Sequence, residues 1–326
     1  YKRQPIPTSS GFANMLINRG GLENKGLEIG LDFTAIDKGD FNLSFGGNIS
    51  FNKSKIENLG LVPGDILMSD GMGGYSNQQI ASYLGNVPSR GNSIKFPVNI
   101  FMEGHEVGLF YGWKTNGMFQ EGDTMYSING SMSQPGDIKV LDLNGDGVVD
   151  LADRTVIGNP NPDYVYGFNV NLSYKGFSMR ALFNGVEGNE IVNGNYYRFG
   201  WAEGTYRNIV ADAWYDRWTP DNPSAAYPRL GYSANLFGAL MDRVIEDGSY
   251  IRLKSITLNY DIPLSNNNFI DAANVYITGS NLFTWTDYSG YDPEITSFLW
   301  DGLLQGTDWN NKPNSRSVLV GVNLNF

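Results

Sequence analysis

The segment DLNGDGVVDLAD, residues 142–153, carries oxygen-bearing side chains at a spacing that suits a calcium ion. Calcium binds about six to eight oxygens, and an EF-hand loop supplies them from positions 1, 3, 5, 7, 9 and 12, with glycine at position 6. The residues at those six positions are Asp142, Asn144, Asp146, Val148 (through its carbonyl), Asp150 and Asp153. Gly147 stands at position 6, so the pattern predicts a structural calcium site.

A second interpretation of this loop stays open. Asp153 stands where glutamate is usual, and its shorter side chain would bind through one oxygen only. No helix pattern flanks the loop, and Asn-Gly-Asp-Gly favours a solvated acidic turn without any metal. Carboxylates this close repel one another unless a cation lies between them, which favours the calcium site.

The sequence contains no credible set of catalytic residues. His105 is the only histidine and the chain contains no cysteine, which excludes the usual nucleophile–base pairs and a disulfide framework. The carboxylate pairs Glu103/Glu106 and Asp292/Glu294 could act as a glycosidase pair, but they stand in loop contexts. We therefore expect no enzyme activity.

The composition narrows the class of partner. The net charge of −11 argues against binding to nucleic acid. The sequence holds no run of 18 apolar residues, so it predicts no transmembrane helix.

Alternating apolar and small polar residues recur along the chain and predict seven β-strands. Most are about 9–12 residues long, the length of a tilted strand that crosses a bilayer. The expected strands are 26–37, 41–51, 164–174, 177–183, 249–262, 273–283 and 316–326.

The connections between these strands alternate between short and long. Short turns are expected at 38–40, 175–176 and 263–272, and long segments at 61–160, 188–248 and 287–314. This asymmetry is typical of outer-membrane barrels. A soluble β-sandwich would also alternate, but its polar face would carry more Lys and Glu. Aromatic residues stand at strand ends, where membrane interfaces are expected: Tyr164, Tyr174, Phe177, Tyr260 and Phe326.

These observations predict an all-β fold, a segment of a transmembrane antiparallel β-barrel with long extracellular loops. The apolar face should meet lipid and the polar face a lumen. The lumen-lining residues would include Asn42, Ser44, Asn48, Asn169 and Asn171. Because an open sheet edge is costly in hydrocarbon and bacterial barrels have even strand numbers, residues 1–326 are expected to be the C-terminal part of one larger barrel domain.

The long segment 188–248 is rich in aromatic residues, which suit stacking on sugars but also pack folded loops. Candidates for contact with a substrate or a lid are Tyr196, Tyr197, Trp201 and Tyr206.

Several blocks of the sequence resemble the SusC/RagA family of TonB-dependent transporters. They are NRGGLENKGLE (18–28), EVGLFYGWKTNGMFQ (106–120), PGDIKVLDLNGDGVVDLADRTVIGNPNPDYVYGFN (135–169), RWTPDNP (217–223), SYIRLKSITLNYDIP (249–263) and NLFTWTDYSGYDPE (281–294). The resemblance implies a 22-stranded barrel of which this chain supplies about the last seven strands. It also implies a plug domain and a TonB-contact segment that are absent from this chain.

The resemblance implies a place in the outer membrane of a Gram-negative bacterium. The expected function is TonB-dependent import of glycans or peptides together with a SusD-like surface lipoprotein, and the partners would be that lipoprotein, TonB and membrane lipid. The alternative is a calcium-stabilised cell-surface module for carbohydrate binding or adhesion, which would be water-soluble without detergent.

Overall fold

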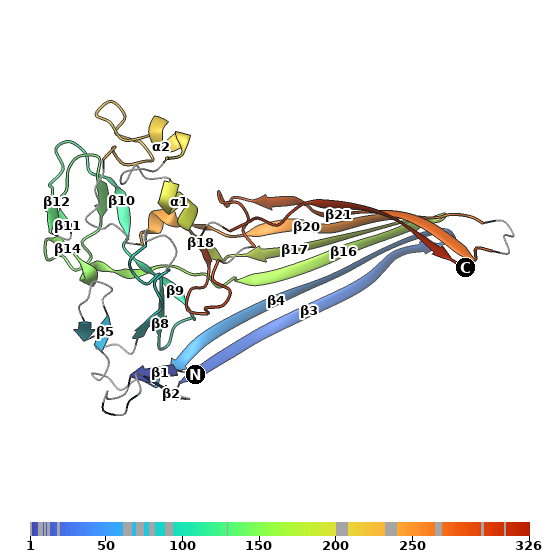
Figure 1. Cartoon of the computed structure of the whole chain (residues 1–326), viewed down its shortest axis with the longest axis horizontal. Helices are drawn as coiled ribbons and strands as arrows, with labels where there is room; N and C mark the ends of the chain where they lie inside the picture. The colour runs from blue at the N-terminus through green and yellow to red at the C-terminus, as the bar shows by residue number, and fades with distance from the viewer. Residues whose placement is uncertain are drawn as a thin grey trace.

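The computed structural model is built on one long antiparallel β-sheet (Figure 1). It describes residues 2–5, 9, 11, 14–17, 20–60, 67–69, 75–77, 82–88, 94–128, 130–199, 208–231, 240–264, 269–294, 297–309 and 311–326. The seven strands of the sheet are β3 (Gly21–Lys38), β4 (Phe41–Asn58), β16 (Tyr164–Tyr174), β17 (Phe177–Glu187), β20 (Tyr250–Asp261), β21 (Ala272–Thr286) and β23 (Ser317–Asn325). They lie in the order β23-β21-β20-β17-β16-β4-β3, so each predicted strand exists and pairs with its neighbours in sequence.

The register of the sheet separates apolar from polar residues, because directly opposed residues in an antiparallel pair share a face. One row of opposed residues crosses all seven strands and is apolar: Phe33, Phe45, Val170, Ala181, Ile256, Gly279 and Val318. The next row is mostly polar: Thr34, Ser44, Asn171, Arg180, Thr257, Thr278 and Leu319. We call the two surfaces the apolar face and the polar face.

A β-bulge in β20 interrupts this alternation. Ser255 lies opposite Leu182, whereas Leu253 lies opposite Phe183, so Lys254 is an extra residue in the ladder. Strict alternation would have placed Arg252 on the apolar face. The bulge instead aligns Arg252 with Asn184 and Thr284 on the polar face.

The two ends of the sheet differ as predicted (Figure 1). The turn Lys175–Gly176 joins β16 to β17 with φ of 48° and 82°, the left-handed values that a tight hairpin turn requires. The three long segments gather at the opposite end of the sheet. Strands β3 and β4 are 18 residues each, longer than predicted, because their pairing continues from Gly21↔Asn58 to Lys38↔Phe41.

The three long segments share one hydrophobic core, and we call them together the loop body. They contribute short strands, including β8 (Asn99–Met102), β9 (Leu109–Gly112), β15 (Thr155–Gly158), β18 (Glu190–Asn193), β19 (Ile245–Asp247) and β22 (Thr307–Asp308). Two short helices, α1 (Gly194–Phe199) and α2 (Ala211–Tyr215), also belong to it. Its core joins Trp113 and Phe119 of the first segment, Leu240 of the second and Trp309 of the third.

No helix within the described residues has the length and apolar character needed to cross a membrane.

Close packing at Gly112 gives a test of the loop body. A Cβ atom there would meet the carbonyl of Leu240 and the side chain of Ile157, which belong to other parts of this body. We expect Gly112→Ala to destabilise the loop body by about 1–3 kcal/mol, the usual cost of overpacking. The measurement is amide hydrogen exchange in the loop body of the full-length protein. Gly302→Ala is the control, because nothing lies within 4 Å of its Cβ position. Equal exchange in the two variants would contradict the packing.

Candidate functional site

The polar face presents amide and hydroxyl groups over most of its length. All five residues predicted to line a lumen lie on it: Asn42, Ser44, Asn48, Asn169 and Asn171. Asn171 donates to Asn169 at 2.8 Å, and the hydroxyls of Thr257 and Thr278 are 2.9 Å apart across two strands. Such a surface offers many hydrogen-bond donors and acceptors.

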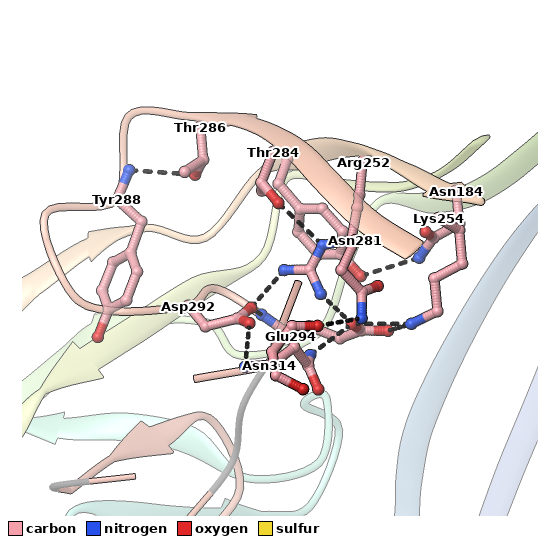
Figure 2. Close-up of polar contacts among 12 residues, drawn as sticks. Asn184, Arg252, Lys254, Asn281, Thr284, Thr286, Tyr288, Asp292, Glu294 and Asn314 are labelled. Atoms are coloured by element: carbon pink, nitrogen blue, oxygen red, sulfur yellow. Dashed lines mark hydrogen bonds and ion pairs between the residues drawn. The ribbon is translucent and has the colours of Figure 1, made fainter. Parts of the chain in front are cut away.

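A dense cluster of opposite charges surrounds Arg252, where the polar face meets the loop body (Figure 2). Arg252 is 1% exposed, and its guanidinium donates to Asp292 and Glu294 of the segment that follows β21. Its Nε donates to Thr284 Oγ1 at 2.9 Å, and Lys254 Nζ lies 3.2 Å from Glu294. We call this set of five residues the Arg252 cluster.

The electrostatics of Asp292 reflect two opposed effects. Burial by itself raises the pKa of the carboxyl. The main-chain N–H of Glu294, the Arg252 guanidinium and the main-chain N–H of Asn314 together outweigh burial, so the net pKa lies below its ordinary value. Asp292 therefore stays ionised. The pair Asp292/Glu294 serves as the counter-charge of Arg252 and not as a free acid–base pair.

A second buried polar contact lies in the loop body. The hydroxyl of Tyr288 donates to Asp308 Oδ2 at 2.8 Å, and Asn195 donates to the same oxygen at 3.2 Å. Burial raises the pKa of the Asp308 carboxyl, and it raises the pKa of the Tyr288 phenol. Because this carboxyl accepts bonds from neutral donors and has no guanidinium beside it, we assign it a structural role.

The 142–153 loop adopts a series of turns closed by its own acidic side chains. Asp142 accepts the main-chain N–H groups of Gly145 and Gly147, at 2.7 and 2.8 Å. Asp153 is fully buried and accepts the N–H groups of Leu143, Asn144 and Asp150. Among the described residues, no three acidic, histidine or cysteine side chains are grouped so that they could hold a metal ion. Calcium stays a prediction for this loop.

Of the four aromatic residues predicted to contact a substrate or a lid, two lie within the described residues. Tyr196 packs against the core of the loop body, and its ring centre lies 5.7 Å from that of Tyr227. Tyr197 lies in α1. Trp201 and Tyr206 fall outside the described residues. For Tyr196, packing is therefore the role that the structure supports.

Sequence reasoning missed the Arg252 cluster. The sequence presents Asp292 and Glu294 as a carboxylate pair in a loop, and nothing in the alternating pattern connects them with β20. A usable signal existed in the block RLKS, since Arg252 and Lys254 stand at positions that strict alternation would turn toward the apolar face. Two charges on that face predict a bulge.

Comparison with known proteins shows similarity to TonB-dependent receptors. TonB-dependent receptor P3 of Formosa agariphila is 32% identical over 333 residues, which cover 99% of this chain and 30% of that protein. TonB-dependent receptor SusC of Bacteroides thetaiotaomicron is 28% identical over 330 residues, 98% of this chain and 28% of SusC. The chain thus spans about a third of the length of the curated relatives it matches. No protein-family model matches the chain.

Solved structures give the same fold. The RagAB peptide transporter superposes with a TM-score of 0.71 at 24% identity, covering 98% of this chain and 31% of that chain. The RagAB peptide importer in its open-open state has the same TM-score at 23% identity, with 99% and 31% covered. The predicted barrel-segment fold and the resemblance to SusC and RagA are confirmed. The curated relatives are named receptors, in agreement with the prediction that the chain is not an enzyme.

The lowered pKa of Asp292 predicts how pH acts on the Arg252 cluster. A carboxyl with a depressed folded-state pKa stabilises the fold above its unfolded value of 3.8, and that stability is lost as the pH falls through the folded-state pKa. We expect proteolysis of the 287–316 segment to be unchanged from pH 8 to 5, and to rise below 3.8. Asp292→Asn should cost about 3–5 kcal/mol at neutral pH, because a buried guanidinium loses a counter-charge. Proteolysis that responds to acid equally in Asp292→Asn would contradict this assignment.

Proposed function

Because the chain belongs to the family of TonB-dependent receptors that includes SusC, we propose that its sheet is part of the wall of an outer-membrane importer. The wall would separate lipid on the apolar face from a lumen on the polar face. The observation that carries the proposal is the register, which keeps apolar and polar rows apart across all seven strands. In a soluble protein, this extended apolar face would need a second layer to cover it.

The apolar face has the exposure expected of a lipid contact. Leu258, Ile277 and Val320 are 48%, 42% and 70% exposed, although they lie side by side in the ladder. A contiguous exposed apolar surface that crosses all the strands of a sheet is rare on soluble monomers.

Aromatic side chains border the apolar face at both ends. Phe41 and Tyr174 pair at the turn end, with ring centres 6.2 Å apart, and Phe51 and Tyr164 pair toward the loop body at 5.6 Å. Ten residues separate Tyr174 from Tyr164 on one strand, which corresponds to about 34 Å along the strand. With a tilt of about 45°, the height is about 24 Å, close to the apolar band of about 25 Å in outer-membrane barrels.

The edges of the sheet support a larger barrel. Within the described residues, β3 and β23 each pair on one side only. Unpaired main-chain groups are costly in hydrocarbon, so each edge would pair with a strand from elsewhere in the protein. The long connections would then face the cell exterior, where a SusD-like lipoprotein could contact the loop body. TonB would act through parts of the protein beyond this chain.

The proposed cargo is an oligomeric nutrient, either a glycan or a peptide. The polar face offers amides and hydroxyls, which suit both classes. The solved structures of similar fold are named for peptide import, but their identities of 23–24% show only the fold. We keep both classes as candidates. The alternative of a soluble adhesion module would leave the apolar face in water.

Two adjacent residues of β16 give the test of this proposal. Val170 lies in the apolar row and Asn171 in the polar row. In the full-length transporter, Val170→Arg should cost about 2–4 kcal/mol, as for a cation near the bilayer midplane. Asn171→Arg should fold and alter uptake only. The measurement is unfolding of the barrel in detergent and in lipid.

Cysteine labelling provides the control, since the chain has no cysteine of its own. Cysteine at Asn171 should react with water-soluble maleimides, while cysteine at Val170 should be protected by lipid. Reaction at Val170 with protection at Asn171 would reject the proposed orientation, because a one-residue shift exchanges the two faces.

We also propose that the 142–153 loop binds one structural calcium ion. An ionised carboxylate has about four lone-pair positions, so the oxygens that accept N–H groups keep further acceptor capacity. Asp142, Asp146 and Asp150 would need to converge around the ion, with Asn144, the Val148 carbonyl and Asp153 as the remaining ligands. Calorimetric titration of the metal-stripped transporter with calcium should show binding that Asp142→Asn weakens. If calcium gives no heat of binding and does not raise the thermal stability of the transporter, the loop does not bind the ion.

A further inference from the structure

The segment between β21 and β23 is attached to the polar face near its start, and its end is bonded back to that start. Near its start, Asp292 and Glu294 accept from Arg252. Near its end, Asn314 donates its main-chain N–H to Asp292 Oδ2 and its side-chain amide to Glu294 Oε2, both at 3.0 Å. The described residues of 287–316, which we call the return loop, are therefore joined start to end and fixed to β20 at one point (Figure 2).

The pairing of β20 with β21 shows how far from the strand ends the return loop is attached. Arg252 lies opposite Thr284, two residues before the end of β21 at Thr286. Phe283 and Trp285 flank Thr284 on the apolar face, where they are 56% and 51% exposed. The carboxylates of the return loop thus reach the level of these aromatic residues, but on the opposite side of the sheet. The return loop therefore contacts the polar face at the end of the strands that adjoins the loop body.

The far part of the return loop is held by the loop body. Its strand β22 pairs with β18, and Phe298, Leu304 and Trp309 belong to the shared core. Tyr291, next to Asp292, is 72% exposed. The return loop is thus fixed at two places, and an exposed aromatic residue directly precedes the buried Asp292.

Arginine fits this junction better than lysine would. Its planar fork donates through separate nitrogens to Asp292, Glu294 and Thr284 at once, whereas an ammonium is a single point charge. The charge is buried, so the contacts are screened very little by salt. A loop held this way is expected to keep one position.

We propose that Arg252 is a positioning residue that holds the return loop across the mouth of the lumen, where the loop limits the size of molecules that enter. This inference rests on the proposed function, because it takes the polar face to be a lumen wall. It adds a fixed entrance constriction and the residue that maintains it. The exposed Tyr291 would be the part of the constriction that entering molecules meet.

The first experiment measures the position of the return loop in the full-length transporter in lipid. Spin labels are placed on cysteines at Tyr291 and at Asn48, an exposed residue of the polar face. The parent should give one narrow distance distribution. Arg252→Met should broaden it and shift it to longer distances, and Arg252→Lys should restore it in part. Arg180→Met is the matched control, because it removes an exposed arginine of the same face that is remote from the cluster. An unchanged distribution in Arg252→Met would overturn the proposal.

The second experiment measures passage through the mouth. A cysteine at Asn169, further along the polar face, is labelled from outside with a small maleimide and with polyethylene glycol maleimides of increasing size. Arg252→Met should raise the labelling rate of the large reagents several-fold and leave that of the small one unchanged. An increase for all sizes alike would indicate general loosening of the barrel and would overturn the role in size limitation.

Two further points keep the outcome interpretable. If Arg252→Met fails to assemble, Glu294→Gln tests the same attachment with the guanidinium and Asp292 intact, and it should give a smaller broadening. No broadening there would also count against the proposal. If the return loop behaves as expected but the transporter takes up neither oligosaccharides nor peptides, the proposed function fails while the attachment of the loop stands.

Discussion

The structure depends on one constraint, that directly opposed residues of antiparallel strands lie on the same face. Each residue in the row from Phe33 to Val318 is placed by its neighbour in the next strand. One register shift anywhere would invert the faces of every strand beyond it. The tight turns at 39–40 and 175–176 fix the register locally.

The bulge at Lys254 shows how a local departure can serve that constraint. On the C-terminal side of the bulge, Thr257 and Asn259 lie on the polar face, and on its N-terminal side Arg252 lies there. The change of parity lets β20 begin with a different pattern, suited to contact with the loop body, and end with the pattern of the sheet. Because Arg252 is almost completely buried, its counter-charges must come with it. The attachment of the return loop therefore follows from the bulge.

The seven strands, their order and their two faces could be predicted from sequence, because a period of two is a local property. The contrast between short and long connections was equally visible. The loop body could not be predicted, since its core joins residues from three separate segments with no shared period. The Arg252 cluster could not be predicted for a similar reason. Arg252 and Asp292 are 40 residues apart, and no local pattern links them. For the 142–153 loop, the sequence predicts the acidic ligands but not the main-chain N–H groups that two of these carboxylates accept.

The shared core of the loop body has a consequence for the order of folding. Ile94 and Trp309 belong to the same cluster although 215 residues separate them in the chain (309 − 94). Contacts between residues so far apart in sequence form late, because closing the long loop between them costs conformational entropy before the contact gives any stability. The hairpins of the sheet, whose contacts are local, can form first and shorten the effective distance. The loop body would then complete its packing only after the last strand has joined the sheet, so a protease-resistant loop body would report that assembly of the sheet is finished.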